Sequence, residues 1–457
     1  MFGKNYNEQL VLGDMVQELV QSTKNHDYNR IYNNYKSKHD FIKSYSFIIG
    51  TDDETGSDFH TNILSEINGK KFYDSDGSEI TVEHHFSNYK NILYLKNKFK
   101  EKINYDSSIF VDSNSINMFE SFYNKKISND FIDFKLKHNI DLNYLPYMME
   151  DYINPHHKKM NTQKTLEKIR IFEIINNLDI EDFQKRNNLS ENLNLLNKHG
   201  FKNIDELIED RIFYFNHFID KLQHQYNKIQ LCNSPYYTFQ SNNKLDIYSV
   251  LSEYYMIFGY ILKILIEKRK NISTEEKIRN VFHQMVLNGR NFKHILEFSY
   301  DYFDDDRKVN QFFNYNNNWS YKKTITETYN KTWDIFLYSM TQKFITNPRH
   351  RFNKQTVDFG VSFFLTKDNK FYRSFVDGYM KKVFIINESI KGRPFVSINE
   401  PTDRSQKVEQ IMNNYYDINM DKLMKLKLKR GKLSHKHQYS ISILFKEQME
   451  REFKIAY

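Results

Sequence analysis

Short apolar runs bounded by polar turns predict strands at both ends of the chain. Runs at residues 45–50 and 107–111 are too short for helices and rich in β-branched or aromatic residues, as is a run at 381–386. The run at 361–365 is almost wholly apolar and predicts a central strand of a parallel sheet. These patterns indicate an α/β protein.

Other patterns near the N-terminal end predict helices and a hairpin. Residues 8–20 have helical spacing of apolar side chains. Two alternating runs between 70 and 85 flank Asp76-Gly77, which predicts a hairpin with a type I′ turn. Residues 142–153 predict a further helix, with Pro146 in its first turn.

From about residue 161 to 313 the pattern changes to long amphipathic helices. Two of them have capping signals, Asn203 three residues before Glu206 and Ser273 three residues before Glu276. The polar stretch 314–323 marks a boundary. A helix at 332–344 follows it, and another is expected after Lys370.

The change of pattern predicts one α/β domain split by a large all-helical insertion. The expected regions are an N-terminal mixed α/β region at 1–100, a first half-domain at 101–160, the helical insertion at 161–320, a second half-domain at 321–400 and a basic C-terminal region at 401–457.

Composition narrows the classes of function. Lys+Arg 66 against Asp+Glu 58 gives a net charge of +8, which suits an anionic partner such as nucleic acid. Cys232 is the only cysteine, which excludes a disulfide framework and a thiolate metal site. The chain begins without a signal-peptide pattern, and its longest hydrophobic stretch, 254–266, is too short to span a bilayer. We expect a cytoplasmic protein with no membrane partner.

Four carboxylates stand at corresponding places in the predicted elements. Asp112 and Asp368 each follow a short apolar strand, Glu150 lies on a predicted helix, and Asp334 starts another. Ligands of open α/β sheets bind at the carboxyl ends of the strands, where Asp112 and Asp368 are expected. Taken singly, each residue also fits a purely structural role, because strand-end turns and helix caps favour Asp.

Taken together, these segments resemble the PilT N-terminus (PIN) nuclease domain. The similar segments are Val111-Asp112-Ser113-Asn114, Glu150 (or its neighbour Asp151), Trp333-Asp334-Ile335-Phe336, and the closing stretch Leu365-Thr366-Lys367-Asp368-Asn369-Lys370-Phe371. The resemblance covers roughly 107–155 and 325–390. The gap between its two halves is far longer than ordinary loops and departs from the family pattern, and a helical insertion would account for it.

The resemblance implies a three-layer fold with a central parallel sheet and a metal-dependent nuclease. Asp112, Glu150, Asp334 and Asp368 would hold Mg²⁺ or Mn²⁺, hard cations that prefer carboxylate oxygens and promote phosphodiester hydrolysis. RNA is favoured over single-stranded DNA as substrate. We expect substrate contacts from Asn114 and Thr366, which belong to the matching motifs, and from Arg349 and Arg351, which lie between two of the acidic elements.

Two alternatives stay open. The strand at 47–50 followed by Asp52 and Glu54 resembles the first motif of DEDD-type 3′–5′ exonucleases, and Asp141 faintly resembles the second. A non-enzymatic alternative is a helical interaction or nucleic-acid-binding protein, in which residues 161–320 mediate self-association or bind a protein partner. The basic tail at 425–436 suits phosphate contact or a disordered solubilising run equally.

Overall fold

The fold is known from a computed structural model of the chain. It describes residues 6–22, 25–52, 71–74, 76–84, 86, 89, 91–96, 105–125, 130–138, 140–144, 147, 150, 162–198, 200–213, 247–288, 292–316, 318–346, 359–368, 371, 381–389, 395–399, 402–430 and 435–457. By its contacts the chain forms two units. Unit 1 comprises Met1–Asn216, Leu337–Tyr372 and Val376–Glu400, and unit 2 comprises His217–Phe336, Arg373–Phe375 and Pro401–Tyr457.

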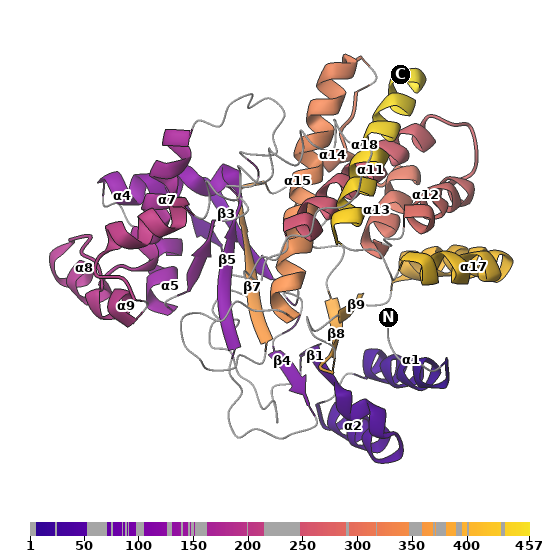
Figure 1. The fold of residues 1–457 in the computed structure, drawn as a ribbon, viewed down its shortest axis with the longest axis horizontal. Helices are drawn as coiled ribbons and strands as arrows, with labels where there is room; N and C mark the ends of the chain where they lie inside the picture. The colour runs from indigo at the N-terminus through magenta and orange to yellow at the C-terminus, as the bar shows by residue number, and fades with distance from the viewer. Residues whose placement is uncertain are drawn as a thin grey trace. The chain divides into compact units, whose positions relative to one another are not determined.

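A five-stranded mixed sheet occupies the centre of unit 1 (Figure 1). Its strand order is β2-β3-β7-β5-β6. The strands are β2 (Phe72–Tyr73), β3 (Glu79–His84), β5 (Tyr105–Val111), β6 (Asp141–Asn143) and β7 (Phe359–Thr366). β7, β5 and β6 are parallel, whereas β2 and β3 are antiparallel additions. The α/β class is therefore confirmed, with a parallel arrangement in three of the five strands.

The register of β5 and β7 brings two segments more than 250 residues apart in sequence to the same level of the sheet. It runs from Tyr105 opposite Phe359 to Val111 opposite Leu365. The apolar side chains at 109–111 of β5 and at 361 and 363–365 of β7 are buried because helices cover both faces. Helices of unit 1 lie on one side (Figure 1), and on the other the Ser362 hydroxyl donates to the Thr341 carbonyl of α15 (2.7 Å). The predicted strands at 107–111 and 361–365 are confirmed.

The helices of unit 1 belong to the segment before residue 214 and to the end of α15. They are α1 (Tyr6–Gln21), α2 (Asn25–Lys38), η1 (Asp40–Ser44), η2 (Ser113–Ser115), α4 (Ile116–Lys125), α5 (Asp130–His138), α7 (Thr162–Asn176), α8 (Ile180–Arg186), α9 (Leu193–Lys198) and a helix at 204–213. Aromatic side chains join α4, α5 and α7, with Phe119 against Phe131 and Phe172 at centroid distances of 6.2 and 5.2 Å.

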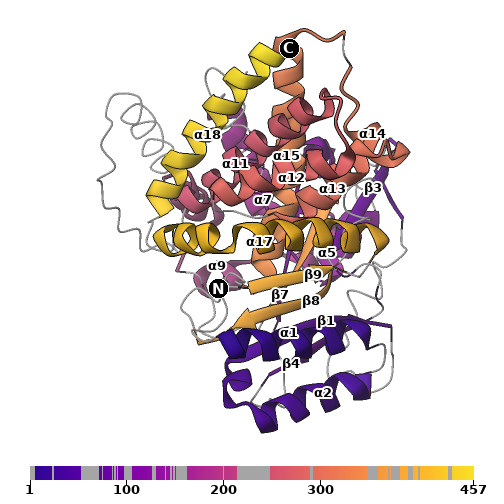
Figure 2. The ribbon, with the colours of Figure 1, turned by 90° about the vertical axis from the view of Figure 1, so that its right-hand side faces the viewer.

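A second sheet in unit 1 is wholly antiparallel. Its order is β4-β1-β8-β9, formed by β1 (Tyr45–Thr51), β4 (Asn91–Leu95), β8 (Lys381–Asn387) and β9 (Phe395–Asn399). Figure 2 shows α1 and α2 over this sheet, and their apolar side chains share one core with it. The predicted strands at 45–50 and 381–386 are confirmed. The latter, however, joins this sheet and not the parallel one expected for region 321–400.

The predicted hairpin at 70–85 is confirmed, but its turn is not type I′. Gly77 has a φ of 79°, whereas Asp76 is not among the residues with positive φ, and type I′ requires it at both central positions. The turn closes through the Asp74 amide on the Ser78 carbonyl (2.9 Å) and the Gly77 amide on the Asp74 carbonyl (2.9 Å). Asp74 therefore lies at the neck of the hairpin.

Unit 2 is helical. Its helices are α11 (Ile247–Lys268), α12 (Thr274–Asn288), α13 (Lys293–Phe303), α14 (Arg307–Phe312), the first part of α15 (Tyr321–Thr346), α17 (Asp403–Arg430) and α18 (His435–Ala456). α11 packs closely on α18, since a Cβ atom at Gly259 would lie 2.2 Å from the Phe445 ring. Where it is described, the basic tail is helical, in α17 and α18, so a disordered run is excluded there.

Several boundaries differ from those predicted from sequence. α7 to α9 belong to unit 1, and α17 and α18 belong to unit 2, so the helical unit does not coincide with 161–320. α15 begins at Tyr321, inside the polar stretch expected as a boundary. Leu142 and Asn143 lie in β6, so the helix predicted from residue 142 is wrong at its start. The predicted caps are confirmed: Asn203 accepts from the Glu206 amide (2.9 Å) and Ser273 from the Glu276 amide (3.2 Å).

Candidate functional site

Asp112 and Asp368 follow neighbouring parallel strands at the same edge of the five-stranded sheet. β5 continues through α4 and α5 to β6 on one side, while β7 pairs on its other side. The strand order therefore reverses between β5 and β7. In open α/β sheets such a switch point at the carboxyl ends of strands is where ligands bind.

The two strand ends are tied together by side-chain hydrogen bonds. The Thr366 hydroxyl donates to Asp112 Oδ2 (2.7 Å) and accepts from the Asn114 amide (3.1 Å). Asn114 Oδ1 in turn accepts from the backbone N–H of Lys367 (2.9 Å). Asn114 and Thr366, predicted as substrate contacts, thus lie beside Asp112 and fix the end of β7 against the end of β5.

The Asp112 carboxyl is buried next to a second acid. Asp112 is 4% exposed. Burial raises the pKa of Asp112 to about 6, and the negative charge of Asp368 adds to the increase. Hydrogen bonds from Thr366, the Ser113 amide and Asn114 lower the pKa and offset part of this effect. Asp112 is therefore a carboxylate that a nearby cation would strongly stabilise in its ionised form.

Asp368 has a structural role in the turn after β7. Its backbone N–H donates to the Thr366 hydroxyl (2.9 Å), and its Oδ1 accepts from the backbone N–H of Phe371 (3.0 Å). The second bond is a side-chain cap, as expected if Asp368 has a purely structural role. Capping engages one carboxylate oxygen, and the charge of the group still acts on Asp112.

A basic side chain lies within the same motif. Lys367 Nζ donates to Asp74 Oδ2 at the neck of the hairpin, and the two side chains are 18% and 7% exposed. Neither residue was among the predicted site residues. The position of Lys367 between Thr366 and Asp368 was the available signal, whereas nothing in the sequence connects Asp74 to it across 293 positions.

The other predicted site residues are not shown beside this pair. Asp334 does not start a helix: it lies in the interior of α15, in the part assigned to unit 2. Glu150 lies half-buried in a helical position of unit 1. Arg349 and Arg351 lie outside the described residues. Of the four predicted carboxylates, the structure brings together Asp112 and Asp368.

The residues of the alternative exonuclease motif are distributed over two sheets. Asp52 is exposed after β1 in the antiparallel sheet, and Asp141 begins β6 in the other sheet. Glu54 lies outside the described residues. No convergence of Asp52 with Asp141 supports this alternative.

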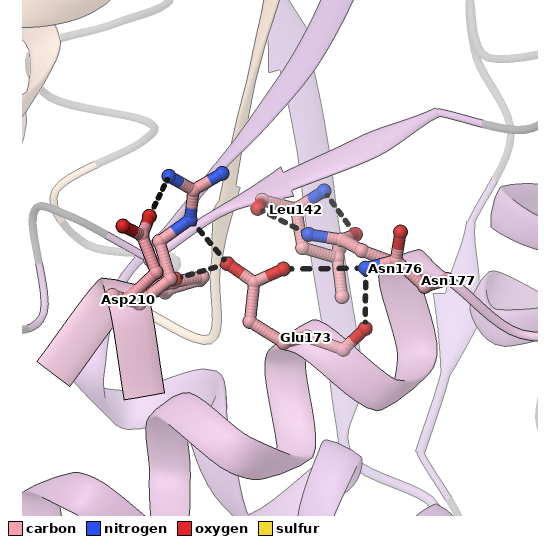
Figure 3. Close-up of polar contacts among 7 residues, drawn as sticks. Leu142, Glu173, Asn176, Asn177 and Asp210 are labelled. Carbon is pink, nitrogen blue, oxygen red and sulfur yellow. Dashed lines mark hydrogen bonds and ion pairs between the residues drawn. The ribbon is translucent and has the colours of Figure 1, made fainter. Parts of the chain in front are cut away.

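A further polar cluster fixes β6, the edge strand of the five-stranded sheet (Figure 3). Glu173 of α7 accepts from the Tyr144 hydroxyl and from Arg211 Nε (3.2 Å). Burial, the largest single effect, lowers the pKa of Arg211, but the charges of Glu173, Tyr144 and Asp210 and the hydrogen bond to Glu173 together outweigh it, so the pKa is raised overall. The Asn176 amide bonds both backbone groups of Leu142 (2.9 and 3.0 Å), as a neighbouring strand would. This cluster orients the strand beside β5 and was not foreseen from sequence, because its partners are 29 to 38 positions apart.

The residues at the β5–β7 edge fit one hard divalent cation. Mg²⁺ is commonly held by one or two carboxylates with water and substrate oxygens completing its shell. Among the described residues no group of three or more His, Cys, Asp or Glu side chains could hold a metal ion, so the predicted four-carboxylate site is not present in that part of the chain.

Comparisons of the chain with protein-family models, curated proteins and solved structures found no match. Among the helices in the described part, none has both the length and the apolar character that crossing a bilayer requires.

Proposed function

We propose that this protein is a metal-dependent nuclease whose site is the carboxyl edge of β5 and β7. The observation that carries the proposal is the juxtaposition of buried Asp112 with Asp368 at the switch point of the sheet. Two acids at this place raise the free energy of the ionised site when no cation is near. A hard divalent cation, Mg²⁺ or Mn²⁺, removes that cost.

The roles of the chain's own residues follow from their contacts. Asp112 and Asp368 would be the cation ligands. Thr366 and Asn114 hold the two strand ends in register by the bonds they make between β5 and β7. A cation bound there would stabilise charge on a phosphate and lower the pKa of a bound water.

The proposed substrate is single-stranded nucleic acid, with RNA favoured over DNA. The net charge of +8 supports a polyanionic partner, because positive charge raises the local concentration of nucleic acid. The resemblance of the Asp112 and Asp368 segments to PIN nucleases supports phosphodiester hydrolysis. Arg349 and Arg351, which lie outside the described residues, remain predicted contributors.

The test is cleavage of end-labelled RNA and single-stranded DNA by the full chain with Mn²⁺, Mg²⁺ or EDTA. Cleavage is expected with Mn²⁺ or Mg²⁺ and absent in EDTA. Asp368→Asn should lose it, whereas Asp52→Asn, which changes an exposed strand-end acid in the other sheet, should retain it. If the protein binds RNA but does not cleave it in either Mn²⁺ or Mg²⁺, the nucleic-acid-binding alternative is favoured and the nuclease proposal is overturned.

Metal binding is tested separately from cleavage. A ligand that binds only the folded state raises its stability by RT ln(1 + [L]/Kd). Mn²⁺ should therefore raise the melting temperature of the wild type, and the increase should shrink in Asp112→Asn. An equal increase in both proteins would place the cation elsewhere.

A further inference from the structure

We infer that Lys367 is a substrate-positioning residue that binds a phosphate of the nucleic acid, and that Asp74 occupies its ammonium group in the free protein. This inference rests on the proposed function, because it concerns the same edge of the sheet. It adds a residue to the site and a competing anion on the β2–β3 hairpin.

The backbone places Lys367 at the centre of the candidate site. It lies between Thr366, which bonds Asp112, and Asp368, and its own N–H donates to Asn114. Lys367 is therefore the immediate neighbour in sequence of Thr366, which bonds Asp112, and of Asp368, the second acid of the pair. A phosphate that approaches Asp112 and Asp368 comes within reach of the four-carbon lysine side chain.

The electrostatics of the site call for such a cation. A phosphate approaching two carboxylates is repelled, and a single divalent ion is shared among all three charges. An ammonium group has three donors and serves as a compact positive charge for phosphate. Lys367 lies between Thr366 and Asp368 and can supply this positive charge.

The present partner of Lys367 is an anion that a phosphate can replace. Asp74 holds the ammonium group through a single carboxylate oxygen. Asp76, on the same hairpin, lies near enough for Lys367 to contribute to its lowered pKa, although the bond from the Ser78 hydroxyl is the larger cause. The hairpin thus presents carboxylates where a nucleic acid would present phosphates. Exchange of one anion for another keeps the ammonium group paired throughout.

The experiment measures the salt dependence of RNA binding in EDTA, which removes the divalent cation and so prevents the proposed cleavage. A single-strand phosphate contact adds about 0.7 to the slope of log K against log salt concentration. Lys367→Met should lower the slope by about that amount, and Lys367→Arg should restore it. The matched control is Lys71→Met, because Lys71 is an exposed lysine next to the same hairpin that pairs with Glu79 (3.4 Å). Its slope should equal that of the wild type.

Asp74→Asn provides the second arm. If Asp74 competes with phosphate, this variant should bind RNA several-fold more tightly at low salt. If the ion pair only ties the hairpin to β7, Lys367→Met and Asp74→Asn should both lower the melting temperature while the slope stays that of the wild type. That result, or weaker binding by Asp74→Asn in a protein whose melting temperature is retained, overturns the inference.

The outcomes separate this inference from the nuclease proposal. Metal-dependent cleavage that needs Asp368, with a slope independent of Lys367, refutes the inference alone. A slope that depends on Lys367 without any cleavage supports the phosphate contact and refutes the nuclease. Absence of RNA binding and of cleavage refutes both.

Discussion

Two central strands in unit 1 run directly into an aspartate, and the two aspartates have opposite surroundings. Asp52 follows β1 and is exposed, whereas Asp112 follows β5 and is 4% exposed. Both strands are central, with a strand on each side. The difference lies in the direction of the neighbours. β1 lies between antiparallel strands, so its carboxyl end meets the amino end of β4, with Thr51 opposite Asn91.

β5 lies between parallel strands, so three carboxyl ends meet at one edge. The residue after β7 can therefore lie beside the residue after β5, and Thr366 can bond Asp112. Acidic residues that follow neighbouring strands can meet at one edge of a sheet when the strands point the same way. Asp52 is therefore the natural control for Asp112 and Asp368.

The largest expected effect is on cleavage. Asp112→Asn and Asp368→Asn should each reduce Mn²⁺-dependent cleavage of RNA by about 100-fold or more, since loss even of an outer partner of a metal ligand costs 10- to 100-fold. Asp52→Asn should cleave like the wild type. The readout is the single-turnover rate on end-labelled RNA. Equal loss in all three variants would mean that the two strand ends do not differ in function.

The next effect concerns the pH dependence of stability without metal. The pKa of Asp112 is raised to about 6 by burial, above the ordinary value of 3.8, so the folded protein binds the proton more tightly than the unfolded chain. The free energy of unfolding should therefore fall as pH rises from about 4 through 6, by about 3 kcal/mol in total from this group.

Urea unfolding at pH 4.5 and pH 7 in EDTA measures this effect. Asp112→Asn should lose that part of the pH dependence, because an amide does not titrate in this range. Asp52→Asn should keep the wild-type dependence. If Asp112→Asn also keeps it, Asp112 does not titrate near pH 6.

Loss of the Thr366 hydroxyl should cost about 2 kcal/mol of stability at pH 7, because the Asp112 carboxylate loses a donor while it stays buried. The matched pair is Thr366→Val, which keeps the shape, and Thr366→Ser, which keeps the hydroxyl. The pKa of Asp112 should rise further in the valine variant, so the pH-dependent loss of its stability, which begins near pH 4 as in the wild type, should continue to a higher pH. A serine variant as unstable as the valine variant would show that the methyl group matters more than the hydrogen bond.

The smallest effect separates the two roles of Asp368. Asp368→Ala should lose about 1 kcal/mol of stability, since it removes the acceptor for the Phe371 amide. Asp368→Asn keeps an acceptor and removes the repulsion of Asp112, so its metal-free stability should equal or exceed that of the wild type. If cleavage survives in the alanine variant, Asp368 is a cap and nothing more.

The sequence by itself determined the local elements. The apolar runs of β1, β5, β7 and β8 were too short and too rich in β-branched and aromatic residues for helices, and the capping residues Asn203 and Ser273 act within three positions. The placement of Asp112 and Asp368 at or next to the ends of strands could be predicted for the same reason. These features depend on period and on nearest neighbours, which a single sequence displays.

Tertiary structure decided which strands became neighbours and in which direction. Nothing local distinguishes β8, which pairs with β1 in an antiparallel sheet, from β7, which pairs with β5 in a parallel one. Asp334 matched a helix start only because the polar stretch before it concealed the first turns of α15. Asp74 and Lys367 meet across 293 positions. Such contacts follow from burial of whole faces over the complete chain, and their free energy has no signature in any short segment.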